Sequence, residues 1–217
     1  MGTPCHGAYT RHFVVYFLRM YYYADMMDAL KKALAERKKI GIIDSKLKPS
    51  AVLLPVFKKE GKCHILFTRR TDSLAHHKGQ ISFPGGGRHS DDKSLLQTAL
   101  RESYEEIGLR EEDVEVIGEL DDAATVTSLF CITPFVGVIP YPYEFKRETY
   151  EVEEIFDVSI EDLLKAVIKE ETVEIGGVSI KVYSYEVGQR VIWGATAWIL
   201  TGFLDILRNA SGARCKF

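Results

Sequence analysis

Three glutamates stand close together in the segment Arg101–Gly108, which reads RESYEEIG. At 100° per residue, a helix through this segment brings Glu102, Glu105 and Glu106 within one arc of about 100°, centred about 130° round from the apolar stripe. Mg²⁺ in proteins is usually held by a few carboxylates together with substrate phosphates. The cluster therefore indicates a divalent cation site. Glutamates on a helix face are more often a solvated surface, and that alternative stays open on the residues alone.

A glycine-rich turn lies just upstream of the glutamates and reads PGGG over residues 84–87. Glycine lets the backbone come close to a phosphate chain, because it carries no side chain. Arg69 and Arg70 precede this turn at the end of a predicted strand, where two guanidinium groups can clamp phosphates. Strand-end arginines are also common on ordinary surfaces. Phosphate binding is therefore a prediction for these two arginines and for Gly85 and Gly86.

The helix that must present the glutamates is predicted from Ser94 to Ile107. Its less polar residues recur at helical spacing, and Gly108 is typical of the residue that follows a helix. The stripe consists of Leu96, Ala99, Leu100, Ser103 and Ile107. Asp92 either caps this helix or supports Arg101, and we favour capping.

The remaining elements follow from periodicity and from turn residues. A helix is predicted over Asp25–Lys39, with Gly41 ending it, and a loop over residues 69–92. Strands are predicted at Ala51–Phe57, Cys63–Thr68, Val114–Leu120, Cys131–Ile139 and Val152–Val158. Later elements are a short helix Ile160–Lys169, a hairpin of Glu171–Ile175 and Val178–Tyr185 around Gly176-Gly177, and a helix Trp193–Leu207. This mixture indicates an α/β sandwich formed by one domain over residues 25–208, between an aromatic extension (1–24) and a tail (209–217).

Composition gives no support for a nucleic-acid or membrane partner. The net charge is −3, from 28 basic and 31 acidic residues, which offers no electrostatic attraction to polyanions. The apolar run within His12–Tyr23 is broken by Arg19, and a membrane span needs about 20 apolar residues. The four cysteines are widely spaced, which disfavours a disulfide framework and favours the cytoplasm.

The segment Gly86–Leu109 resembles the Nudix box, whose pattern is G-x5-E-x7-R-E-U-x-E-E-x-G-U with U an apolar residue. The second half matches at Arg101, Glu102, Ser103, Glu105, Glu106, Gly108 and Leu109. In the first half, Asp92 stands at the acidic position, and the spacing to Arg101 is one residue longer. This longer form resembles the coenzyme A pyrophosphatase branch of the family.

A second stretch resembles the same branch, whose upstream signature is roughly L-L-T-K-R-[SA]-x3-R-x3-G-x3-F-P-G-G. Here the stretch Leu66–Gly86 keeps the spacing, with Arg69 in place of the lysine and Thr71 in place of the small residue. Ala75 stands where the signature has an arginine, and His76, His77 or Lys78 can supply the missing charge. Because alanine cannot bind a phosphate through two hydrogen bonds, other Nudix substrates stay open as alternatives.

The resemblance implies a Nudix-type α/β/α sandwich with a mixed β-sheet. It also implies Mg²⁺- or Mn²⁺-dependent hydrolysis of a nucleoside diphosphate linked to another group. Glu102, Glu105 and Glu106 map onto the metal-binding and catalytic positions. Gly86 is expected to supply a backbone carbonyl or a close approach at the metal. Arg101 orients a glutamate through an ion pair. Outside the box, Glu151 and Glu154 are candidates for a further ligand or general base, and an exposed charge without a role stays open as the alternative for both.

The expected substrate is coenzyme A or an acyl derivative, cleaved to 3′,5′-ADP and 4′-phosphopantetheine or its acylated form. The alternatives are a Nudix hydrolase of ADP-ribose, a dinucleoside polyphosphate or NADH, and, in a different class, a non-catalytic nucleotide sensor. Trp193 and Trp198 are interpreted as core or subunit contacts. The apolar last helix and the aromatic extension suggest a homodimer.

Overall fold

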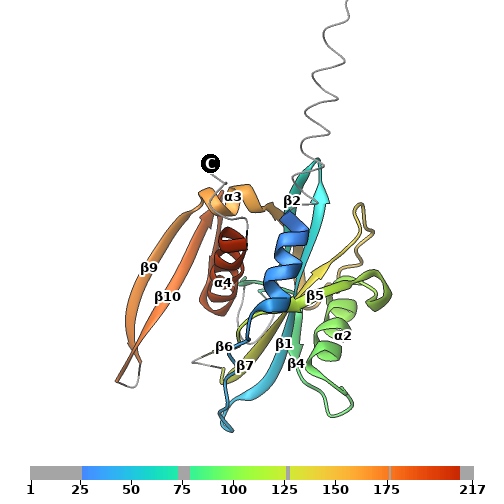
Figure 1. Ribbon diagram of the computed structural model, residues 1–217. Helices are drawn as coiled ribbons and strands as arrows, with labels where there is room; N and C mark the ends of the chain where they lie inside the picture. The colour runs from blue at the N-terminus through green and yellow to red at the C-terminus, as the bar shows by residue number, and fades with distance from the viewer. Residues whose placement is uncertain (1–25, 73–78, 126–127, 176, 211–217) are drawn as a thin grey trace, which may run out of the picture.

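A mixed β-sheet lies at the centre of the computed structural model, which describes residues 26–72, 79–125, 128–175 and 177–210 (Figure 1). The long central strand β1 pairs in parallel with β7 and antiparallel with β2 and β4. Strand β8 adds to β2, and β5 and β6 add to β7. The strands are β1 (Lys48–Lys59), β2 (Lys62–Arg70), β3 (Ile81–Ser82), β4 (Gly85–Gly87), β5 (Glu115–Glu119), β6 (Ala123–Ala124), β7 (Phe130–Val138) and β8 (Val152–Ser159).

Helices cover both faces of this sheet. On one face, α2 (Leu95–Ile107) packs its Ala99 and Ile107 in one buried cluster with Leu53 and Leu66 of the sheet. On the other face lie the helix over residues 26–36, α3 (Ile160–Lys165) and α4 (Gly194–Ala210), and a short 3₁₀ turn, η1 (Glu111–Asp113), follows α2. The predicted α/β/α sandwich with a mixed sheet is therefore confirmed (Figure 1).

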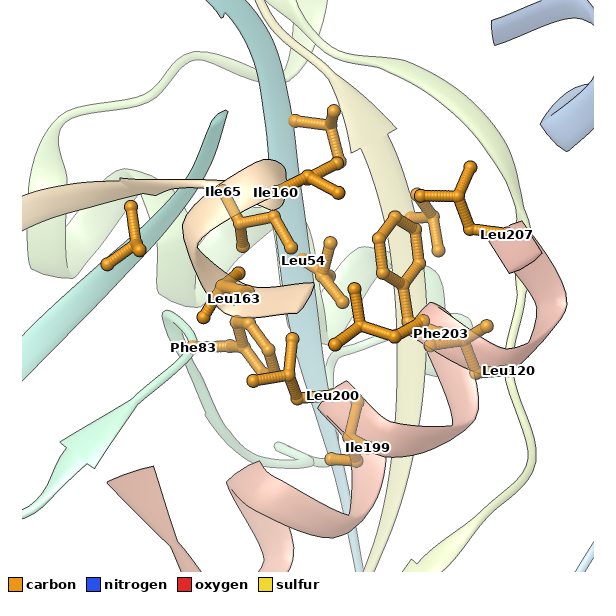
Figure 2. Close-up of a cluster of buried hydrophobic side chains, with 14 of the residues drawn as sticks. Leu54, Ile65, Phe83, Leu120, Ile160, Leu163, Ile199, Leu200, Phe203 and Leu207 are labelled. Atoms are coloured by element: carbon orange, nitrogen blue, oxygen red, sulfur yellow. The ribbon is translucent and has the colours of Figure 1, made fainter. Parts of the chain in front are cut away.

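The core under α4 is the larger of the two buried clusters (Figure 2). Leu200 and Phe203 of α4 pack with Leu54 and Ile65 of the sheet, and all four side chains are fully buried. Leu30 of the 26–36 helix belongs to the same cluster. Burial of side chains of this size stabilises the fold by about 2 kcal/mol each. The early helix and the last helix thus share one core.

A second sheet of three antiparallel strands lies on the outer side of α4: β9 (Val167–Ile175), β10 (Val178–Val187) and β11 (Arg190–Trp193). The predicted glycine hairpin is confirmed, because β9 pairs with β10 around a turn in which Gly177 has φ of 81°. The predicted helix through Lys169 is wrong beyond Lys165, since the chain there pairs as β9 with β10. Strand β11 was not predicted, and it includes Trp193.

The ends of the first and last helices also differ from prediction. The first helix ends at residue 36, before Gly41, and the following chain is held by Asp121 and Asp122, which accept the backbone N–H groups of Ile40 and Ile42. Helix α4 continues to Ala210, two residues into the predicted tail. No helix of the described residues is long and apolar enough to cross a membrane. The aromatic run before residue 25 lies outside the described part of the chain.

Candidate active site

Helix α2 is built by local signals at both ends. Ser94 is the N-cap, and its side chain accepts the backbone N–H of Gln97 at 3.1 Å. Gly108 ends the helix in the left-handed conformation with φ of 70°, and its N–H donates to the Ser103 and Tyr104 carbonyls. The preference for Asp92 as the cap is therefore wrong. The helix itself is confirmed, within one residue at its start.

The three glutamates of this helix have different environments. Glu106 is 5% exposed, whereas the Glu105 side chain is about half exposed. Glu106 Oε2 accepts the Gly85 N–H at 3.3 Å. The pKa of Glu106 is raised to about 8, mainly by burial and to a smaller extent by the nearby Glu102 and Glu151, while Arg70 and the Gly85 N–H oppose the rise. A helical wheel places Glu106 in the same arc as Glu102 and Glu105, but in the fold Glu106 is buried, in contact with Gly85 of β4 and Arg70 at the end of β2.

Strand β4 corrects the predicted loop over residues 69–92. Gly85, Gly86 and Gly87 pair with Val52, Ala51 and Ser50 of β1, so the glycine backbone lies at a fixed place beside α2. A Cβ atom on Gly86 would lie 2.5 Å from the Glu102 carboxyl carbon. The absence of a side chain at Gly86 is therefore what admits the Glu102 carboxylate against the backbone.

Gly85 is needed for a different reason. Its φ of 154° is in the region that favours glycine, and a Cβ atom there would lie 2.4 Å from the Ala51 carbonyl oxygen. That contact is with backbone, which cannot move aside without breaking the β1–β4 pairing. Gly85 therefore maintains the fold of the strand, and Gly86 makes room for a carboxylate.

Arg101 forms ion pairs with three carboxylates, those of Asp92, Glu102 and Glu105, and we call this group the Arg101 hub. Its guanidinium donates to both Asp92 oxygens at 3.0 Å, and to Glu102 and Glu105 at 2.9 Å each. It also donates to the Gly87 carbonyl oxygen at 3.2 Å. The predicted ion pair of Arg101 with a glutamate is confirmed.

Asp92 anchors this hub from a buried position, 4% exposed. It also accepts the Thr98 hydroxyl and the His89 N–H, both at 2.9 Å. The Arg101 guanidinium, with these two donors, holds the pKa of Asp92 well below its usual range. The structure thus shows the second alternative for Asp92, in which its carboxylate holds the Arg101 side chain in place.

The Glu102 carboxylate is the link between this hub and the buried Glu106. Burial raises the pKa of Glu102, with Arg101 opposing and Glu105 and Glu151 adding to the rise. Each of these carboxylates therefore destabilises the charged form of another. A cation placed among them relieves that repulsion.

Glu151 reaches the same place from the segment before β8. Glu148 accepts the backbone N–H groups of Tyr150 and Glu151 at 3.0 and 2.8 Å, and its own N–H donates to the Glu106 carbonyl. This segment is thereby fastened to the end of α2. Sequence reasoning missed Glu148. The signal that could have found it is local: an acidic side chain can accept the backbone N–H groups two and three residues later and so form a turn.

Glu154 belongs to the opposite face of the sheet. It pairs with Arg69, at 3.2 Å, and with Arg190 of β11. The Arg190 guanidinium lies 4.3 Å from the centre of the Phe156 ring, which packs against the core under α4. Arg70, in contrast, contacts Glu106 beside α2. The two adjacent arginines thus separate, and sequence reasoning missed Arg190, which lies far along the chain.

The donors beside α2 suit a hard cation. Glu102, Glu106 and Glu151 offer only carboxylate oxygens, and Gly86 leaves a place against the backbone. Among the described residues no group of three or more histidine, cysteine, aspartate or glutamate side chains is arranged to hold a metal ion. In this arrangement Glu102 and Glu105 form ion pairs with Arg101. The residues therefore fit Mg²⁺ or Mn²⁺ in donor chemistry, and their roles as ligands remain predictions.

Several other predicted residues lie away from this site. Trp198 is 45% exposed and lines a cavity of about 210 Å³ with Tyr183, between α4 and β10. Trp193 is 51% exposed. Neither tryptophan is therefore a core residue, and the subunit-contact alternative stays a prediction. Residues 73–78, which include Ala75, His76, His77 and Lys78, lie outside the described residues. Cys63 and Cys131 are free thiols.

Comparisons with known proteins agree with this geometry. A NUDIX domain model matches residues 46–173. The uncharacterized Nudix hydrolase NudL of Photorhabdus laumondii is 37% identical over 152 residues, 70% of this chain and 80% of that protein. NudL of Yersinia enterocolitica is 36% identical over 153 residues, 70% of this chain and 77% of that protein.

A solved structure adds a likeness of fold. The MutT/nudix family protein from Enterococcus faecalis matches with a TM-score of 0.53 over 82% of this chain and 71% of that chain, at 11% identity. The family match covers the sheet, α2 and the carboxylates of the site. The chain therefore belongs to the Nudix family and is an enzyme of its pyrophosphatase class, a hydrolase of phosphoanhydride bonds.

Proposed function

We propose that the protein is a Mg²⁺- or Mn²⁺-dependent pyrophosphohydrolase of coenzyme A or acyl-coenzyme A. The products are 3′,5′-ADP and 4′-phosphopantetheine or its acylated form. The assignment of the substrate rests on the Leu66–Gly86 stretch, which resembles the signature of the coenzyme A branch. The structure supports a role for this stretch in the site, because its Arg70 contacts Glu106 and its Gly85 N–H donates to the same carboxylate.

The proposed ligands of the cation are Glu102, Glu105 and Glu106, with the Gly86 backbone beside them. When bound, the cation neutralises the charge that develops on the pyrophosphate oxygens. Arg101 holds Glu102 and Glu105 in place through its 2.9 Å contacts. Arg70 and the N–H groups of the glycine strand face the phosphates.

The reaction consumes one water. Its oxygen attacks a phosphorus of the pyrophosphate, the bridging P–O bond breaks, and each product keeps one of the two phosphates of the pyrophosphate. A carboxylate must take the proton of the attacking water. Glu105 is the partly exposed candidate on α2, and Glu151 is the candidate from the segment before β8. Glu154 is the weaker candidate, since it is paired with two arginines on the other face.

A substrate panel tests the proposal and its alternatives together. Coenzyme A, acetyl-coenzyme A, ADP-ribose, diadenosine tetraphosphate and NADH are each incubated with Mg²⁺ and with Mn²⁺, and the products are separated by chromatography. We expect the highest kcat/KM for a coenzyme A compound. A kcat/KM for coenzyme A far below that for ADP-ribose or another panel member would overturn the substrate assignment while leaving the reaction class intact.

Two further parts of the proposal concern organisation. Residues 25–208 are proposed to form one domain, supported by the core that Leu30 shares with Phe203. The exposed Trp193 and Trp198 are proposed as contacts of a homodimer. Light scattering on the purified protein measures the oligomeric state, and a monomeric mass at micromolar concentration would contradict the dimer.

A further inference from the structure

Arg70 is held less tightly than its position suggests. Its Nη1 lies 3.7 Å from Glu106, and its Nη2 lies 3.5 Å from Glu151. Charge-assisted hydrogen bonds between arginine and carboxylate are about 2.7–2.9 Å long. Both contacts are therefore long, although the guanidinium lies between two carboxylates.

The third nitrogen of Arg70, Nε, has no hydrogen-bond partner within the part of the chain that the structure describes. Among the buried side-chain nitrogen and oxygen atoms of the described residues, Arg70 Nε alone lacks a hydrogen bond. An unsatisfied buried donor is costly, and native proteins seldom keep one without a reason such as a missing ligand. Nε and one Nη together form the fork that binds a phosphate through two hydrogen bonds.

Arg101, in the same site, shows how an arginine with a full set of hydrogen-bond partners is held. Its three nitrogens donate to five acceptor atoms, at 2.9–3.2 Å. Arg101 is thus locked by its partners, whereas Arg70 can leave its carboxylates at little cost. The two arginines differ in what they can do when another cation arrives.

We propose that Arg70 is an exchangeable counterion: it neutralises Glu106 and Glu151 when no metal is bound, and turns to a substrate phosphate when a divalent cation binds Glu106 and the other carboxylates of α2. The inference rests on the proposed function, because it needs the carboxylates beside α2 to be the cation site. It deepens that function by coupling the two binding events. The cation frees the group that binds the phosphate, and Arg70 competes with the cation in the absence of phosphate.

The effect of Arg70 on the affinity for the cation can be calculated from the repulsion between their charges. Even with water-like screening, a unit positive charge about 5 Å from a divalent cation weakens its binding by roughly tenfold. Arg70→Gln removes this charge and keeps a polar side chain. We expect Arg70→Gln to bind Mn²⁺ about tenfold more tightly than the wild type when no nucleotide is present. Free Mn²⁺ is measured by electron paramagnetic resonance during a titration of the full chain.

The second half of the test uses a non-hydrolysable ligand, adenosine 5′-(α,β-methylene)diphosphate, at saturating Mn²⁺. Loss of a two-bond arginine–phosphate contact is expected to weaken its binding by about tenfold or more. Arg69→Gln is the matched control, since Arg69 is the adjacent arginine but pairs with Glu154 on the other face. Its Mn²⁺ affinity is expected to stay within about twofold of the wild type.

Arg70→Lys keeps the test decisive if Arg70→Gln does not fold. Lysine retains the charge but not the planar fork, so Mn²⁺ affinity should stay close to that of the wild type while binding of the methylene analogue weakens. Unchanged or weaker Mn²⁺ binding by Arg70→Gln would overturn the inference, and so would unchanged analogue binding by Arg70→Lys.

Failure of the inference is distinguishable from failure of the proposed function. Neither titration uses coenzyme A or turnover, so a different substrate in the panel leaves both results standing. A wild-type protein that binds no Mn²⁺ would overturn the cation site and this inference together. A wild-type protein that binds Mn²⁺, with no change in Arg70→Gln, would overturn this inference alone.

Discussion

The substitution Glu106→Gln is expected to make the metal-free protein more stable at alkaline pH. Burial raises the pKa of Glu106 from 4.5 to about 8 in the folded protein. The folded carboxyl therefore keeps its proton at pH values at which the unfolded one has lost it. Stability falls with pH wherever the folded state binds more protons, so Glu106 destabilises the fold progressively between pH 4.5 and pH 8.

The magnitude follows from the two pKa values. The full displacement corresponds to at most about 5 kcal/mol, of which about 3 kcal/mol develops between about pH 5.5 and about pH 8.5. Glutamine has nearly the same shape and does not titrate. Relative to Glu106→Gln, the wild type should lose about 3 kcal/mol of unfolding free energy over that interval.

The assay is urea denaturation of both proteins with EDTA at each pH, followed by circular dichroism. Glu105→Gln is the control, because its half-exposed side chain lies next to Glu106 on the same helix, and it should keep the wild-type slope. Added Mg²⁺ should restore the wild type at high pH, since a ligand of the folded state stabilises it. An identical pH slope in Glu106→Gln and wild type would refute the reasoning from burial.

Three further pairs of substitutions test the residues that support the site. Asp92→Asn should lower the unfolding free energy by about 3 kcal/mol, because it breaks a buried pair with Arg101, whereas the exposed neighbour Asp91→Asn should change it by less than about 0.5 kcal/mol; equal losses would contradict the hub. Gly86→Ala should displace the Glu102 carboxylate and weaken Mn²⁺ binding with a melting temperature near that of the wild type, while Gly85→Ala should lower that temperature through its clash with the Ala51 carbonyl. The reverse order would disprove the roles assigned to the two glycines. Glu151→Gln should lower kcat by roughly tenfold, and Glu154→Gln by less, in a steady-state assay; a larger loss for Glu154→Gln would contradict the role of Glu151 as a candidate general base.

Features set by neighbours in the sequence were predictable. The spacing of the stripe and Gly108 gave the position of α2, and Gly176-Gly177 gave the hairpin of β9 and β10. These signals act within a few residues, so a single sequence contains them. The sandwich followed, because predicted helices lie between groups of strands and after them along the chain.

Features set by partners far along the chain were not predictable. The surroundings of the buried Glu106 include Gly85 of β4 and Arg70 of β2, which come from 21 and 36 residues earlier in the chain. The chain after Lys165 becomes a strand because β10 pairs with it. Arg190 reaches Glu154 from β11, across 36 residues. Periodicity assigns a residue to an arc of its own helix, and the tertiary fold decides what that arc faces.

The central claim is that the carboxylates of α2 carry out metal-dependent pyrophosphate hydrolysis. The most direct measurement is kcat for the preferred substrate of the panel, at saturating Mg²⁺, in wild type, Glu105→Gln and Glu106→Gln. We predict a loss of about a hundredfold or more in each variant, with folding intact by circular dichroism. Wild-type kcat in both variants would contradict the claim.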